Sequence, residues 1–119
     1  MLSDLARVTA EIGRDALLTQ GAGGNTSVKI AGELWIKASG AWMRDAETQP
    51  TFVAVPLDEL VEVARNGDEG ALRVISAPAA ANGLRPSVEA VVHAIIPHRA
   101  VCGGVRASAH GRHDDQAYC

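Results

Sequence analysis

The feature that most constrains the fold is a glycine-rich segment that joins a helical pattern to a hairpin pattern. Three of the five residues of Gly21–Asn25 are glycines. The segment before it predicts an amphipathic helix that starts near Ser3, because apolar residues recur there at steps of three and four. The segments 26–30 and 33–37 alternate between residue types and flank an Ala-Gly turn, which predicts an antiparallel hairpin. The apolar residues of the predicted helix are Leu5, Val8, Ile12 and Ala16.

The rest of the chain continues this mixture of helices and strands. Residues 41–50 are predicted as a loop and residues 51–55 as a short strand. A helix is predicted over 56–65, ended by the glycine at position 67. After a loop over 76–86, Ser87 is predicted to cap a short helix that stops near Pro97.

Composition limits the class of protein. The 119 residues are 47% hydrophobic and 21% charged, which predicts one globular domain or a piece of a larger one. A net charge of −3 and only 3% aromatic residues argue against a nucleic-acid-binding protein. No apolar run reaches the roughly 18 residues of a membrane span, and no secretory signal is visible. Cys102 and Cys119 form no disulfide framework, so a cytoplasmic protein is expected.

Three segments carry groups that suit an anion. The first, Gly21–Ser27, offers backbone N–H groups, an amide and two hydroxyls. It is neither a Walker A loop nor a dinucleotide fingerprint, because no Gly-Lys-Ser/Thr follows and because it comes after a helix. The second segment is Ala38-Ser39-Gly40, and the third is Pro86–Glu89 at the predicted start of a helix. Taken singly, each is more simply a turn, a strand end or a helix cap.

Glu89 and His93 are four residues apart, so they share one helical face. Two interpretations stay open: a pair of metal ligands, or a structural pair, which is the more common case. His110 and His113 are three residues apart, with no predicted helix beneath them, so a zinc site there is an open but weakly indicated alternative.

In combination and in this order, the motifs resemble the class II aldolase/adducin family. The similar segments are Gly24–Ser27 with Lys29, Ile36–Gly40, and Arg85–Glu89 with His93. The resemblance extends from about Leu2 to Val101 and is strongest to the branch of rhamnulose-1-phosphate and fuculose-1-phosphate aldolase-like proteins.

The resemblance implies an α/β/α sandwich around a central, mainly antiparallel sheet. It also implies a zinc-dependent aldolase or epimerase that cleaves a phosphorylated sugar through a metal-stabilised enediolate, and a homo-oligomer in the intact family. Glu89 would be the catalytic acid/base. Val88 stands where relatives have a second hydroxyl residue. The substrate phosphate would be bound by Gly24, Asn25, Ser39, Gly40 and Ser87.

The similarity weakens after Val101. Relatives have a His-x-His pair of zinc ligands whose counterparts here would be Gly103 and Val105, so no metal ligand is assigned. We therefore predict that residues 1–101 are the N-terminal portion of an incomplete family domain. Residues 102–119 are predicted to be an unpatterned tail, from truncation or a shifted reading frame.

Three functional hypotheses follow. The chain is a metal-dependent aldolase-like domain, incomplete and inactive if its zinc site is lost. Alternatively it is a non-catalytic, adducin-like interaction module, or a phosphate-binding domain. An aldolase needs a bound divalent ion, whereas the other two do not.

Overall fold

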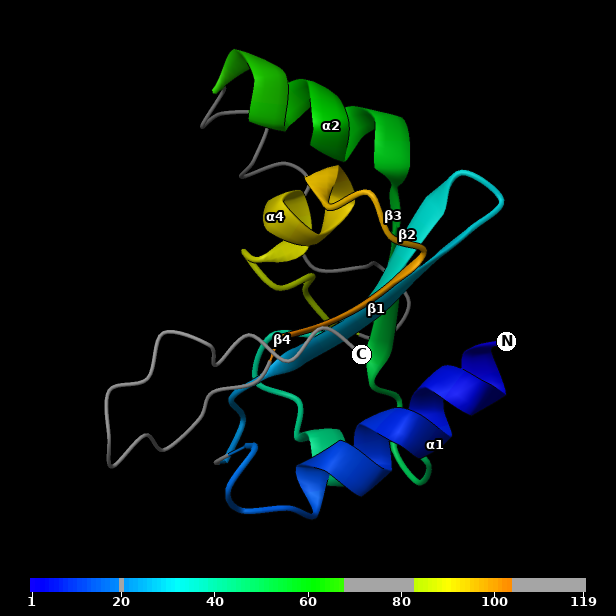
Figure 1. Cartoon of the computed structure of the whole chain (residues 1–119), viewed down its shortest axis with the longest axis vertical. Helices are drawn as coiled ribbons and strands as arrows, with labels where there is room; N and C mark the ends of the chain where they lie inside the picture. The colour runs from blue at the N-terminus through cyan, green and yellow to red at the C-terminus, as the bar shows by residue number, and fades with distance from the viewer. Residues whose placement is uncertain (20, 68–82, 104–119) are drawn as a thin grey trace.

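A four-stranded antiparallel sheet forms the centre of the molecule (Figure 1). The structure is a computed structural model and describes residues 1–19, 21–67 and 83–103. The strand order is β3-β2-β1-β4. The strands are β1 (Asn25–Ile30), β2 (Glu33–Lys37), β3 (Phe52–Pro56) and β4 (Ala100–Gly103).

The predicted hairpin is confirmed. In β1 and β2, Ser27 pairs with Ile36 and Ile30 pairs with Glu33. The turn between them places Ala31 at φ 50° and Gly32 at φ 80°. Two consecutive positive φ values are typical of the type I′ turn, whose twist matches that of the strands it joins.

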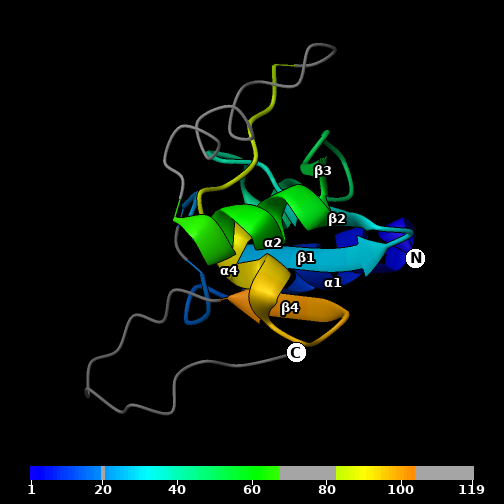
Figure 2. The ribbon, with the colours of Figure 1, turned by 90° about the horizontal axis from the view of Figure 1, so that it is seen from above.

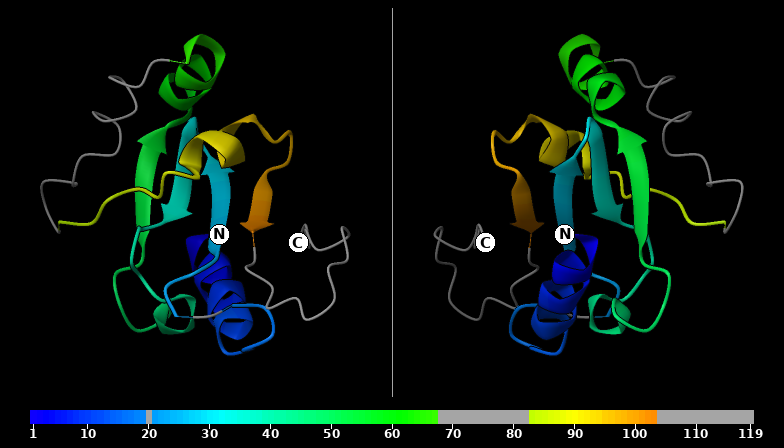
Figure 3. Two further views of the ribbon diagram at one scale, coloured as in Figure 1. Left: turned by 90° about the vertical axis from the view of Figure 1, so that its left-hand side faces the viewer. Right: turned by 90° about the vertical axis from the view of Figure 1, so that its right-hand side faces the viewer.

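Helices cover both faces of this sheet (Figures 2 and 3). Helix α1 (Leu2–Gly13) lies on one face, where the Thr9 and Thr26 hydroxyls are 2.6 Å apart. Helices α2 (Leu57–Asn66) and α4 (Ala90–Ile95) lie on the other. This confirms the predicted sandwich of helices around an antiparallel sheet. The main core lies under α2 and α4 and includes Leu34, Ile36, Val53, Val55, Leu60, Ala90 and Ala94.

The ends of the helices differ from the prediction. Helix α1 begins at Leu2 with Met1 as its N-cap, so Ser3 is inside the helix, and Ala16 lies beyond its end. Helix α2 ends as predicted, at Gly67 with φ 62°. In the loop predicted over 41–50, the backbone forms one turn of 3-10 helix, η1 (Met43–Asp45).

Strand β4 extends the sheet beyond the predicted boundary at Val101. Its last two residues, Cys102 and Gly103, pair with Thr26 and Asn25 of β1. Where the domain itself ends stays a prediction, because residues 104–119 lie outside the described residues, as do residues 68–82 of the predicted loop. Within the described ranges, no helix is long and apolar enough to cross a membrane.

Candidate functional site

Asn25 joins two motifs that are far apart in the sequence. It is the first residue of β1 and only 6% of it is exposed. Its Nδ2 donates hydrogen bonds to Ser87 Oγ at 3.2 Å and to Glu89 Oε2 at 2.6 Å. The Gly-Asn loop and the Pro-Ser-x-Glu segment therefore meet in space, which is the arrangement that the sequence motifs suggested.

The chain before α4 forms a tight turn that presents Glu89. Ser87 Oγ accepts a hydrogen bond from the Glu89 N–H at 3.2 Å, and Ser87 O accepts one from the Ala90 N–H at 3.0 Å. The helix itself starts at Ala90 with Glu89 as its N-cap, two residues after the predicted cap, and Ser87 caps the turn that leads into it. The Glu89 side chain is 53% exposed, so its carboxylate is held by Asn25 and still reaches solvent.

The Ser-Gly turn lies against the same segment. Ser39 N–H donates to Arg85 O at 2.8 Å, and Ala38 forms an isolated bridge with Pro86. Gly40 has φ 81°, which the turn requires and which a residue with a side chain would adopt only under strain. Ser39 and Gly40 are exposed, so the Ser39 hydroxyl is accessible, whereas the Ser39 N–H is already bonded to Arg85 O.

Gly24 has a packing reason to be glycine. Its φ is 80°, and a Cβ built there would lie 2.7 Å from Met43 Sδ and 3.0 Å from Thr19 Cγ2. A side chain there would displace Met43 and adopt a strained left-handed backbone, so the glycine has a structural reason whether or not a ligand is bound.

Lys37 is a member of the cluster that the sequence analysis did not assign to the site. The residue is 2% exposed, and its Nζ donates to the carbonyls of Ala22, Ala38 and Ala41 at 3.2, 3.1 and 2.6 Å. Burial lowers the pKa of the Lys37 ammonium, and the Glu89 carboxylate acts in the opposite direction. Lys37 thus ties the glycine-rich segment to the Ser-Gly turn and places a buried positive charge between them.

His93 lies behind Glu89, on the same face of α4. It is 3% exposed, its Nδ1 is 2.7 Å from Ser27 Oγ, and its Nε2 is 4.0 Å from Glu89 Oε2. Burial lowers the pKa of His93 below its usual 6.5; Glu89 opposes this shift and Lys29 adds to it. At neutral pH the imidazole is therefore uncharged.

The lowered pKa of His93 predicts a loss of stability in acid. Below about pH 6.5 the unfolded chain takes up a proton at this position while the folded protein does not, so the free energy of unfolding should fall as the pH decreases. The variant His93→Gln has no group at this position that takes up a proton in this pH range. Urea denaturation between about pH 7.5 and pH 5.5 should therefore show a larger loss for the wild-type protein than for the variant. A stability difference that does not change with pH would contradict the assignment.

The described residues do not fit a zinc centre. Zinc sites in proteins take three or four His, Cys or carboxylate ligands. No group of three such side chains lies together within residues 1–19, 21–67 and 83–103. Glu89 and His93 form a pair without a third donor, and Ser27 lies within hydrogen-bond distance of one nitrogen of that imidazole.

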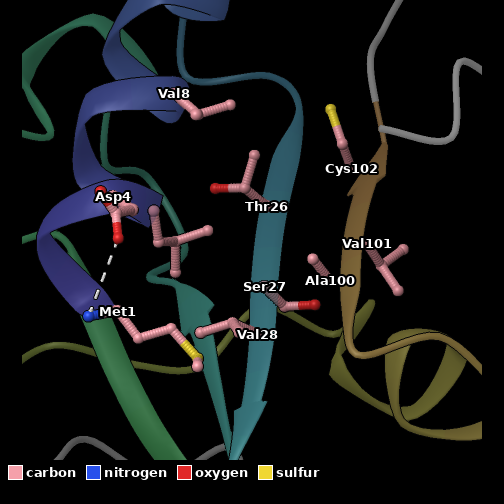
Figure 4. Close-up of a pocket in the computed structure, with 10 residues that line it drawn as sticks. Met1, Asp4, Val8, Thr26, Ser27, Val28, Ala100, Val101 and Cys102 are labelled. Carbon is pink, nitrogen blue, oxygen red and sulfur yellow. Dashed lines mark ion pairs between the residues drawn. The ribbon is translucent and has the colours of Figure 1, made fainter.

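At least two hollows on the described surface lie away from the polar cluster around Asn25. One, of about 190 Å³, is an apolar groove between α1 and strands β1 and β4, lined by Met1, Val8, Thr26 and Cys102 among others (Figure 4). The other, of about 430 Å³, lies between the end of α1 and Trp42. Neither is lined by Asn25, Ser87 or Glu89, so the polar cluster is a separate feature.

The molecule is an α/β domain with an antiparallel sheet between helices and a polar cluster at the start of β1. This is the α/β/α sandwich that the sequence motifs predicted. The family model described as "Class II Aldolase and Adducin N-terminal domain" matches residues 3–113. The chain belongs to the class II aldolase/adducin family.

A solved structure supports this assignment. It is the N-terminal class II aldolase domain of a conserved protein from Thermoplasma acidophilum, 26% identical, with a TM-score of 0.66. The match covers 87% of this chain and 54% of that one, so the chain spans about half the length of this relative. No curated protein matches the chain.

Proposed function

We propose that the polar cluster binds a phosphorylated sugar or a similar small phosphorylated molecule, the substrate class of the family's carbon–carbon lyases and epimerases in carbohydrate metabolism. The proposal depends on one observation: the Asn25 amide donates hydrogen bonds to both Ser87 and Glu89. These two residues lie more than 60 positions after Asn25 in the sequence. Gly24, Asn25, Ser39, Gly40 and Ser87 would form the phosphate end of the site.

The two ends of the proposed site have different chemistry. At the phosphate end, the Ser39 and Ser87 hydroxyls would donate hydrogen bonds, and the buried Lys37 ammonium would favour an anion. At the other end, Glu89 contacts Asn25 and His93 through Oε2. Its Oε1 would then accept a proton from a substrate carbon or hydroxyl, as a general base does. Binding the phosphate would fix the distance between substrate and base.

The metal-dependent part of the family's chemistry is not assigned to these residues. In an intact family enzyme a divalent metal, zinc in the relatives that the motifs resemble, would stabilise the enediolate of aldol cleavage. The described residues do not fit that centre, and this favours a second candidate: a non-catalytic, adducin-like or phosphate-binding module. The metal content of the purified chain separates the two: one divalent ion per chain supports the lyase, and none supports the module.

Calorimetric titration with inorganic phosphate and with a sugar phosphate tests the proposed binding. Replacing Ser39 or Ser87 with alanine should weaken binding by about tenfold, because each change removes a hydrogen bond to a charged ligand. Ser3→Ala, on the exposed surface of α1, is the matched control and should bind as the wild type does. Equal affinities for the sugar phosphate and its unphosphorylated sugar would refute the proposal. Glu89→Gln should keep the affinity if Glu89 acts only in catalysis.

A further inference from the structure

Ser27 and His93 form a buried polar pair that the proposed function leaves without a role. Ser27 is fully buried on β1, and its hydroxyl lies 2.7 Å from Nδ1 of the His93 imidazole. In Figure 4 the side chains of Thr26 and Ser27 leave β1 on opposite sides. Ser27 is among the residues that line the apolar groove, and its hydroxyl faces the His93 imidazole of α4. Because Ser27 is fully buried, its hydroxyl is not presented to solvent.

The geometry around His93 favours one tautomer. Its Nε2 faces the Glu89 carboxylate at 4.0 Å, with the Nδ1–Ser27 contact on the opposite side of the ring. A carboxylate attracts an N–H and repels a nitrogen lone pair. The proton should therefore be on Nε2, and Nδ1 should accept the Ser27 O–H.

Gly103 has no side chain that could stand between His93 and Glu89. A Cβ built at Gly103 would lie 3.7 Å from His93 Nε2 and 3.9 Å from Glu89 Oε2. A side chain at this position would stand beside both groups. With glycine there, the imidazole N–H faces the carboxylate directly.

We propose that His93 is a positioning residue for Glu89 and that Ser27 sets its tautomer. The Nε2–H attracts Oε2 from behind while the Asn25 amide binds the same oxygen at 2.6 Å. At 4.0 Å the imidazole contact is electrostatic rather than a direct hydrogen bond. The low pKa of His93 supports this role, because a neutral imidazole keeps the single proton that the contact needs. This positioning role of His93 rests on the proposed function in one respect: it assumes that Glu89 is the general base.

NMR of the full chain with nitrogen-labelled histidine and asparagine tests the proposal without any ligand. In the wild type, His93 Nδ1 should resonate far downfield of Nε2, the pattern of a proton on Nε2. Ser27→Ala should shift the imidazole toward a mixture of tautomers. In His93→Phe, which keeps a ring but has no donor, the Asn25 side-chain amide proton should move upfield as its bond to Glu89 weakens. His93→Gln, which can place an N–H near the position of Nε2, should restore it.

Three results would overturn the proposal. One is a proton on Nδ1 of the wild-type His93 imidazole. This measurement does not depend on the folding of any variant. A second is an unchanged Asn25 amide resonance in a folded His93→Phe variant, as expected if His93 only fills space. The third is an identical change in His93→Phe and His93→Gln. None of these measurements uses phosphate, so failure of ligand binding would count against the proposed function and not against this inference.

Discussion

Replacing Lys37 with methionine should lower the free energy of unfolding by about 3 kcal/mol and weaken phosphate binding by at least about tenfold. The ammonium donates to three backbone carbonyls, of Ala22, Ala38 and Ala41, from a side chain that is almost fully buried. Methionine fills a similar volume but removes this donor from all three carbonyls, of which Ala38 O still accepts from the Ala41 N–H at 3.2 Å. It also removes the positive charge between the two loops. Urea denaturation and calorimetric phosphate titration measure the two effects.

Lys29 offers the matched control on the neighbouring strand. Its Nζ also donates to two backbone carbonyls, of Ile96 and His98, and burial also lowers the pKa of its ammonium. It lies on β1 at the turn before β4, away from the glycine-rich segment and the Ser-Gly turn. Lys29→Met should cost less stability and leave phosphate affinity unchanged. Equal losses of phosphate affinity in the two variants would show that general positive charge, and not the position of Lys37, matters.

The parts of the fold that the sequence predicted are those set by local rules. The bounds of β2 agree with the prediction, because alternation of residue types and an Ala-Gly turn fix a hairpin without help from the rest of the chain. The end of α2 was also predictable, because Gly67 supplies the left-handed residue that closes a helix. The first residues of α1 and α4 were not predictable to the residue. Ser3 lies inside α1, and Ser87 caps the turn two residues before α4 begins, because a capping residue marks a turn and not the exact start of the helix.

The candidate site was predicted as motifs, not as contacts. Spacing alone placed Glu89 and His93 on one helical face, and the structure confirms this. The bond from Asn25 to Glu89 depends on how β1 and α4 pack, which no local pattern encodes. Lys37 was missed for a related reason. A lysine at the end of a strand is usually exposed, and only the loops that close over it make it a buried cation.

Replacing Gly13 with alanine should destabilise the protein by about 2–3 kcal/mol, although alanine is the better helix former. In most helices this change stabilises by roughly 0.5–1 kcal/mol, because glycine loses more conformational freedom on folding. Gly13 is the last residue of α1, and η1 packs directly against it. A Cβ built there would lie 2.1 Å from Arg44 N and 2.5 Å from the Met43 carbonyl carbon. Both are backbone atoms, so no side-chain rotation relieves the clash and α1 must move away from η1.

Gly32→Ala is the control that separates a clash from backbone strain. A Cβ at Gly32 would meet nothing within 4 Å, but the residue has φ 80°. Its cost is therefore the roughly 1–2 kcal/mol of a left-handed conformation alone. The two variants should also differ in fluorescence. The chain has two tryptophans, so emission is measured in a Trp35→Phe background that leaves Trp42. The Arg44 guanidinium lies 4.4 Å from the centre of the Trp42 ring, so moving η1 in Gly13→Ala should change Trp42 emission, whereas Gly32→Ala should not. If Gly13→Ala is as stable as the wild type with unchanged emission, the close contact between α1 and η1 is wrong. The packing that holds Met43 against Gly24, and with it the start of the proposed site, would then need a different explanation.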